Sequence, residues 1–245
     1  FFLLAEVWGG SASVLDDYFK NDEMDSGFDF TFRGECRAFV EGKGRTIAYG
    51  AYLERRHRVR DGYHLAHYLS SHDEPQLLHE LGGDKEAFRL CVALQMTSLG
   101  IPVIYYGEEV GRESNVWPLN RTDMPWGARD IEPGGGIDRD ESMRDWYQRL
   151  IAIRRAHPAL RTGDFARLST DGDLLVFART EPDQSDAVIV AVNRGQTLAT
   201  ASVPTPAEWQ DATVVDALTG TAAATSGGAL EVAVPGRSVR IYVKR

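Results

Sequence analysis

The chain has 245 residues, of which 43% are hydrophobic, which is enough for a packed core and for one large domain or two ordinary ones. Its formal net charge of −9 argues against nucleic acid or an anionic membrane surface as a partner. No apolar run approaches the roughly 20 residues that a membrane-spanning helix needs, so we expect no membrane insertion.

Residues 1–160 alternate short apolar runs with segments of helical periodicity. The predicted strands cover residues 2–7, 28–32, 63–70 and 101–106. The predicted helices cover residues 13–18, a broken stretch over 33–56, and residues 85–99 and 141–156. Because mostly apolar strands alternate with helices, the pattern indicates an α/β fold in which parallel strands are covered by helices.

The periodicity changes near Thr162, after which short alternating segments are separated by turns. Strands are predicted at residues 165–169, 174–179, 187–193, 213–216, 230–234 and 239–243. This pattern is typical of an antiparallel β-sandwich, so we predict two domains, 1–161 and 162–245. Within the second, "TGTAAATSGG" (219–228) is expected to be a flexible hairpin loop.

The two cysteines, Cys36 and Cys91, both lie in helix-like sequence. Buried free thiols are favoured over a disulfide there, and they do not decide the compartment.

Carboxylates follow three of the predicted strands. Glu6 comes after "FFLLA", Asp73 after "YHLAHYLSSH", and Glu108 and Glu109 end "YYGEE". The carboxyl ends of parallel strands meet at one rim of an α/β barrel. Carboxylates converging there suit cleavage of a glycosidic bond, in which one acid protonates the leaving oxygen and others stabilise positive charge on the sugar.

The general acid must hold its proton near neutral pH, so it should be the least hydrated carboxyl group. Glu6, which stands in apolar sequence, fits this role best. A carboxylate at a strand end can also cap a helix or form a loop salt bridge, and this interpretation is favoured for Glu108 and Glu109. It stays open for Glu6 and Asp73, and Trp8 fits either a core position or a sugar-stacking surface.

We expect no metal and no cofactor. His64 and His67 would lie on opposite faces of a strand, so they cannot bind one ion together. The acidic stretches 16–25 and 129–141 lack the regular ligand spacing of a calcium loop.

Taken together, the stretches "LLAEVWGG", "GFDFTF", "YLSSHDEPQ", "GIPVIYYGEEVG" and "NRTDMPWG" resemble the second half of the α-amylase superfamily of glycoside hydrolases, in the family's order. The resemblance implies strands five to eight of a (β/α)8 TIM barrel followed by a β-sandwich. It also implies an α-linked glucan or oligosaccharide substrate and a retaining mechanism.

Carried over by position, the resemblance makes Glu6 the general acid/base and Asp73 the carboxylate that stabilises the transition state. His72 would bind sugar hydroxyls, and Trp8 would form a subsite wall. Ser71 stands where the family most often has Asn. The loop that borders the cleft in many relatives would contain Asn120, Arg121 and Trp126.

The family's nucleophile, an aspartate two residues after an arginine on the fourth strand, has no counterpart on a predicted strand here. The only Arg-x-Asp is Arg121-Thr122-Asp123, in a turn-rich loop. Since the chain also lacks an initial Met, we expect an N-terminal half-barrel to be its missing partner. Alone, the chain should be inactive or barely folded.

Two further interpretations belong to other functional classes. A non-catalytic barrel relative could serve as a binding or scaffold subunit, but such relatives usually lose the acidic residues that are present here. The C-terminal domain could bind carbohydrate, but its main aromatic residues, Trp209 and Tyr242, are too few for a platform, which favours a packing role.

Overall fold

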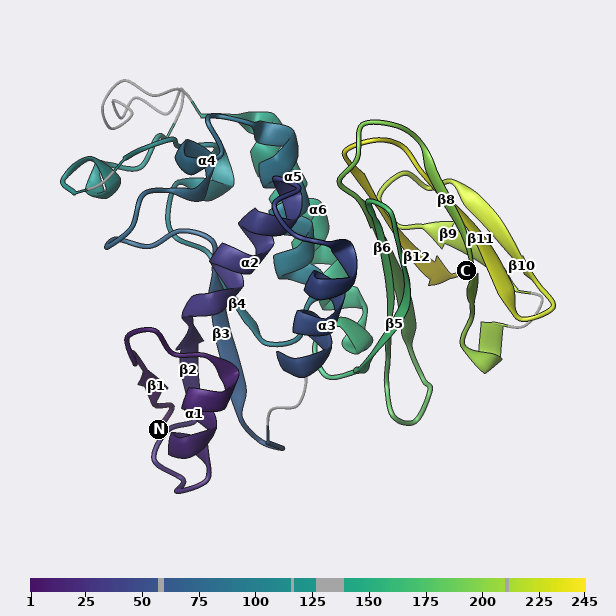
Figure 1. Ribbon diagram of the computed structural model, residues 1–245, viewed down its shortest axis with the longest axis horizontal. Helices are drawn as coiled ribbons and strands as arrows, with labels where there is room; N and C mark the ends of the chain where they lie inside the picture. Colours follow the sequence, from purple (N-terminus) through teal and green to yellow (C-terminus); the bar gives the residue numbers. More distant parts are fainter. Residues whose placement is uncertain (57–59, 116, 127–138, 210–211) are drawn as a thin grey trace. The chain divides into compact units, whose positions relative to one another are not determined.

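The structure is a computed structural model, and it describes residues 1–56, 60–115, 117–126, 139–209 and 212–245 (Figure 1). The chain forms two compact units, each assembled from separate segments. The first contains Phe1–Arg37, Val59–Gln95 and Gly100–Arg149. The second contains Ala38–Arg58, Met96–Leu99 and Leu150–Arg245. The domain boundary placed near residue 162 stays a prediction.

The first unit is built around four parallel strands that pair in chain order. They are β1 (Leu4–Ala5), β2 (Ser26–Asp29), β3 (His64–Tyr68) and β4 (Ile101–Val103). Four of the five residues of β3 are buried, as is typical of a strand in a parallel sheet. The parallel pairing confirms the arrangement expected from the alternation of strands and helices.

Helices follow each strand, as such crossover connections require. They are α1 (Ala12–Phe19), α2 (Phe30–Val40), α4 (Leu77–Glu80), α5 (Lys85–Thr97) and α6 (Glu141–Ala156), with 3-10 turns η1 (Glu108–Val110) and η2 (Leu119–Arg121) after β4. Phe32 of α2 packs on the His67 ring of β3 at 4.5 Å, so α2 covers one face of the sheet. The side chain of Gln95 in α5 donates to the carbonyls of His67 (3.3 Å) and Val103 (3.0 Å) and ties α5 to β3 and β4.

The prediction of a strand over residues 28–32 was wrong at its end. Phe30 begins α2 because Asp29 caps that helix, its Oδ1 accepting the Thr31 amide (3.0 Å) and hydroxyl (2.6 Å). Cys36 and Cys91 are both free and fully buried, as expected.

The second unit holds α3 (Thr46–Arg56), the turns η4 (Pro158–Leu160) and η5 (Ala207–Trp209), and an antiparallel sheet. Its strands are β5 (Asp164–Asp171), β6 (Leu174–Thr180), β7 (Ala187–Asn193), β8 (Ala199–Pro204), β9 (Thr213–Asp216), β10 (Ala222–Ser226), β11 (Ala229–Val234) and β12 (Ser238–Lys244). They run in the order β5-β6-β7-β12-β9-β10-β11-β8.

The stretch 219–228 is not the expected hairpin loop. It contains β10, which pairs with β9 and, through a tight turn, with β11. Gly227 and Gly228 make that turn with φ of 58° and 77°, a conformation that favours glycine.

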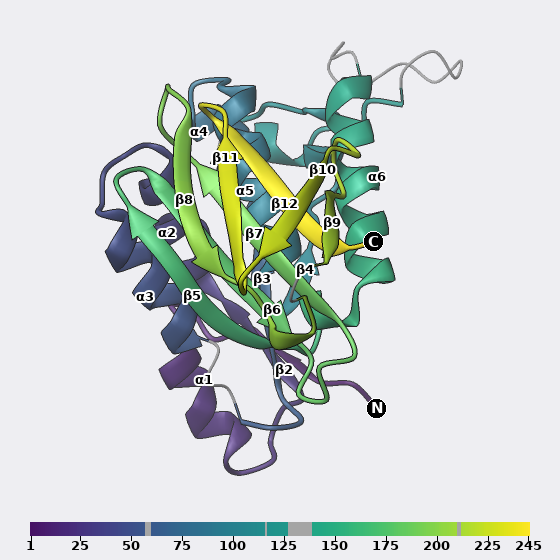
Figure 2. The same ribbon diagram turned by 90° about the vertical axis from the view of Figure 1, so that its right-hand side faces the viewer.

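The antiparallel sheet folds over on itself, since β8 also contacts β5 and β6, and β11 contacts β7 (Figure 2). Apolar side chains from both layers form one core. Trp209 and Tyr242 are 1% and 5% exposed within it, which agrees with a packing role.

Within the second unit, buried arginines bond the main chain of Met96 and Thr97, the last two residues of α5. Arg179 is fully buried and donates to the carbonyls of Thr97 (2.9 Å) and Gly163 (2.8 Å). Arg154 donates to the carbonyl of Met96 (2.8 Å). Burial lowers the pKa of Arg179 to about 9, so its charge depends on these carbonyl dipoles.

Candidate active site

A pocket lies at the carboxyl end of the four-stranded sheet. The residues just beyond each strand line it, so the pocket exists because the four parallel strands end together. Its lining includes four of the predicted site residues, Glu6, Trp8, His72 and Asp73.

Arg121, the remaining predicted site residue, reaches the same place from η2. Its Nη2 donates to Asp73 Oδ1 at 2.9 Å and its Nε to the His72 carbonyl at 3.1 Å. His72 Nε2 lies 3.3 Å from the other Asp73 oxygen. The Asp73 carboxylate therefore sits between a guanidinium and an imidazole, and the structure brings all the predicted site residues together.

Aromatic rings form the apolar wall of the pocket. The Trp8 and Phe30 ring centroids are 5.4 Å apart, and Tyr68 lies 5.7 Å from Phe30 and 5.9 Å from Phe28. Burial raises the pKa of Tyr68 far above its usual value, so its hydroxyl keeps its proton. An apolar wall with a few polar groups at its rim suits a sugar ring, which has apolar faces and polar edges.

Trp8 is 78% exposed, so the core position considered for it was wrong. Glu6 is also exposed, contrary to the expectation that it is the least hydrated carboxyl group. It follows β1, an edge strand on which Leu4 is 43% exposed, and the described residues leave this edge open to solvent.

The least hydrated of the candidate carboxyl groups is Glu108, which is 1% exposed. Its burial raises its pKa to about 8, although the nearby hydroxyls of Ser70 and Tyr147 oppose the shift in part. Glu108 does not line the pocket, and its carboxyl group interacts with Ser70 at the start of the loop that carries His72 and Asp73. This position agrees with the structural role favoured from the sequence.

The loop after β3 is shaped by its serines. Ser71 Oγ accepts the Asp73 amide at 3.2 Å, and Ser70 Oγ accepts the Leu77 amide at 3.1 Å. The serine that replaces the family's usual asparagine thus provides an acceptor next to Asp73.

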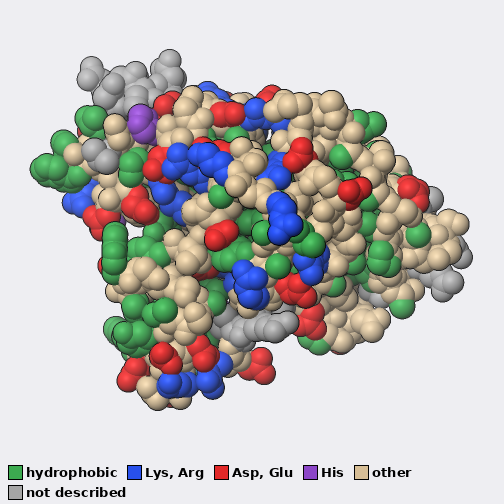
Figure 3. Space-filling view, in the orientation of Figure 1, with side chains coloured by type: hydrophobic (Ala, Val, Ile, Leu, Met, Phe, Trp, Pro, Cys, Tyr) green, Lys and Arg blue, Asp and Glu red, His purple; other side chains and the backbone are tan. Residues whose placement is uncertain are grey.

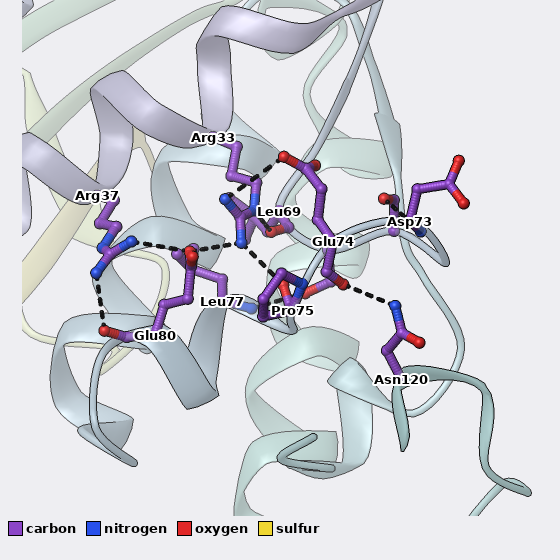
Figure 4. Close-up of polar contacts among 11 residues, drawn as sticks. Arg33, Arg37, Leu69, Asp73, Glu74, Pro75, Leu77, Glu80 and Asn120 are labelled. Atoms are coloured by element: carbon purple, nitrogen blue, oxygen red, sulfur yellow. Dashed lines mark hydrogen bonds and ion pairs between the residues drawn. The ribbon is translucent and has the colours of Figure 1, made fainter. Parts of the chain in front are cut away.

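Two side chains that hold this loop were not recognised as such. The sequence placed Asn120 only at the border of the cleft, and it placed Arg33 only at the start of a helical stretch, with no sign that either side chain bonds the loop. Both donate to main-chain carbonyls of the loop, which they meet only through folding (Figure 4).

Within the described residues, no three His, Cys, Asp or Glu side chains are placed to hold a metal ion. The acidic stretch 129–141 lies mostly outside those residues. No helix in the described part of the chain is long and apolar enough to cross a bilayer.

A family model for the alpha-amylase catalytic domain matches residues 1–144, more than half of the chain. The chain therefore belongs to the α-amylase family, whose members include the glycoside hydrolases named below, and the resemblance seen in its motifs is confirmed.

Among individual relatives, the chain is 28% identical to a cyclomaltodextrinase of Geobacillus thermopakistaniensis, over 98% of this chain and 39% of that protein. It is 30% identical to neopullulanase 2 of Thermoactinomyces vulgaris, over 79% of this chain and 32% of that protein. A solved cyclomaltodextrinase structure covers all of this chain with a TM-score of 0.83 and 26% identity, and 40% of that structure is matched. The chain thus spans well under half the length of these relatives.

Proposed function

We propose that this chain is part of a retaining glycoside hydrolase that acts on α-linked glucans. It supplies strands five to eight of a (β/α)8 barrel, over residues 1–161, and a C-terminal β-sandwich domain, over 162–245. The observation that carries the proposal is one pocket lined by Glu6, His72 and Asp73. The similarity to a cyclomaltodextrinase and a neopullulanase supports α-linked glucans as the substrate class.

In this proposal Glu6 protonates the leaving oxygen and later activates water, while Asp73 stabilises the charge that develops on the sugar. His72 and Arg121 orient the sugar and Asp73, and Trp8 stacks against a sugar ring. A non-catalytic scaffold role is less well supported, because the acidic residues on which catalysis depends are in place.

Retaining cleavage also needs a nucleophilic carboxylate about 5 Å from the acid. Asp123, in the only Arg-x-Asp sequence, does not line the pocket. We therefore assign the nucleophile to an N-terminal half-barrel outside this chain, and we expect the chain alone to be inactive.

The edge of the sheet supports such a partner. Phe2 and Leu3, just before β1, and Leu4 within it are 58%, 42% and 43% exposed. Hydrophobic side chains lie on the surface at the lower left of Figure 3, the region where Figure 1 places β1. An apolar edge strand with unpaired backbone groups is a template for a further strand. In the assembled protein, the fourth strand of the N-terminal half would pair with β1 and cover Glu6.

A chimera tests the proposal. The N-terminal part of the Geobacillus cyclomaltodextrinase, up to the start of its match, is fused in front of residue 1, and hydrolysis of cyclodextrins and pullulan is measured. We expect activity in the chimera, none in the 245-residue chain, and a loss of about 100-fold or more with Glu6→Gln. Strong hydrolysis by the 245-residue chain alone would contradict the proposal. Sugar binding by the chimera without any turnover would favour the scaffold role.

A further inference from the structure

The loop from Leu69 to Pro75, which carries His72 and Asp73, is held at both of its ends by one side chain. Arg33 of α2 donates from Nε to the Leu69 carbonyl (3.0 Å) and from Nη2 to the Pro75 carbonyl (2.8 Å) (Figure 4). The planar guanidinium fixes the directions of these bonds together, so it sets the distance across the base of the loop.

Carboxylates hold the guanidinium in turn. Glu80 Oε2 accepts from Arg33 Nη2 at 2.5 Å, and Glu74 lies 3.8 Å from Nη1. Arg33 is only 8% exposed, so water competes little for these bonds. The neighbouring Arg37 contacts the same Glu80 oxygen, at 2.9 Å, but it makes no bond to the two ends of the loop that Arg33 joins.

The tip of the loop is held separately. Asn120 is fully buried, and its Nδ2 donates to the carbonyls of His72 (2.8 Å) and Glu74 (3.1 Å). The direct contact between Arg121 and Asp73 is much more exposed, with 46% and 45% of the two side chains accessible. The buried bonds, and not this exposed pair, therefore determine where the loop lies.

We propose that Arg33 is a positioning residue for Asp73, acting through the main chain of the loop without touching the substrate. This inference rests on the proposed function, in which Asp73 stabilises the transition state. A carboxylate that acts at the transition state loses effect when it is displaced by a fraction of an ångström, whereas ground-state sugar binding by the aromatic wall does not.

The test compares Arg33→Lys with Arg33→Met and with the matched control Arg37→Met. Lysine keeps the charge beside Glu80 but cannot bond both loop ends in the fork geometry of arginine, so Arg33→Lys is the variant expected to fold. Arg37→Met removes a cation from the same helix and from the same carboxylate.

The first readout needs no activity. In the 245-residue chain, hydrogen exchange of the Asp73 amide and the NMR chemical shifts of the His72 and Asp73 amides report the loop directly. We expect Arg33→Lys to speed exchange by about tenfold or more and to move both amide resonances, with Arg37→Met close to the parent. Unchanged exchange and unchanged resonances in both Arg33 variants would overturn the proposal, whether or not the chimera is active.

The second readout uses the active chimera. We expect Arg33→Lys to lower kcat by roughly 10-fold to 100-fold with KM changed less than about threefold, and Arg37→Met to change both less than about threefold. An equal fall in kcat for the two variants, or a change confined to KM, would overturn the positioning role. An inactive parent chimera would count against the proposed function only, since the loop measurement stands by itself.

Discussion

We expect the burial of Glu108 to make the stability of the first unit depend on pH. Its carboxyl group is 1% exposed, and desolvation raises its pKa to about 8. The same burial raises the pKa of Tyr147, so the adjacent hydroxyl also stays protonated. Between the unfolded pKa of 4.5 and the folded value, the folded chain binds more protons than the unfolded chain, so stability falls as pH rises through this range.

The size of the effect follows from the two pKa values of Glu108. Linkage gives a cost of up to about 5 kcal/mol above pH 8, of which roughly 2–3 kcal/mol develops between pH 5 and pH 7. Glu108→Gln, which is close in shape to the protonated acid, should remove this dependence. We expect the variant to match the parent near pH 4 and to be more stable by a few kcal/mol at pH 8.

The assay is urea unfolding at several pH values, followed by pulsed hydrogen exchange on peptides from residues 85–95 and 141–149, which belong to the same unit. Glu113→Gln is the control, because it makes the same chemical change at a carboxylate that is not buried. The Glu113 side chain is 45% exposed and lies 3.5 Å from His79. It should keep the parent's dependence on pH. If Glu108→Gln and the parent lose stability in parallel as pH rises, the reasoning is wrong.

Three further predictions concern other side chains. In the chimera, Arg121→Met should lower kcat/KM by less than about tenfold, since its ion pair with Asp73 is half-exposed, and a larger loss in steady-state assays would contradict this. Arg179→Met removes the hydrogen bonds to the carbonyls of Thr97 and Gly163, so it should destabilise the second unit by about 2 kcal/mol, measured by urea unfolding on peptides from residues 187–193. An unchanged stability would contradict this and would show that removal of the buried charge compensates for the lost hydrogen bonds. Carbodiimide should label the exposed Glu6 readily in the 245-residue chain and slowly in the chimera, and equal labelling, read by mass spectrometry, would show that the added half does not cover it.

Local sequence was sufficient where one periodicity persisted between clear ends. Helix α6 covers Glu141–Ala156, as predicted, because its apolar positions keep a helical spacing over four turns. The boundary at Asp29 was missed because the apolar residues on both sides concealed its role as a helix cap. The available sequence signal for this helix start was Asp29, a residue type that often caps helices, two positions before Thr31.

Strands β8 and β10 were missed for a different reason. Their Ala-rich sequences have little intrinsic strand preference, and they form strands because they pair with neighbouring strands. The six residues of β8 pair with β11, about thirty positions away in the chain, and no local pattern reveals that register.

At the candidate site, the motifs predicted which residues to consider but not their surroundings. The side chains of Asp73, His72 and Arg121 meet because they follow neighbouring strands and turns of the same unit. The exposure of Glu6 depends on what packs beside β1, and the apolar residues next to Glu6 in the sequence do not reveal this. The part of the pocket around Asp73 is thus organised by this chain's own buried side chains, Arg33 and Asn120. Glu6, by contrast, is exposed, so the proposed role of general acid requires a surface that covers it, which the proposed N-terminal half-barrel would provide.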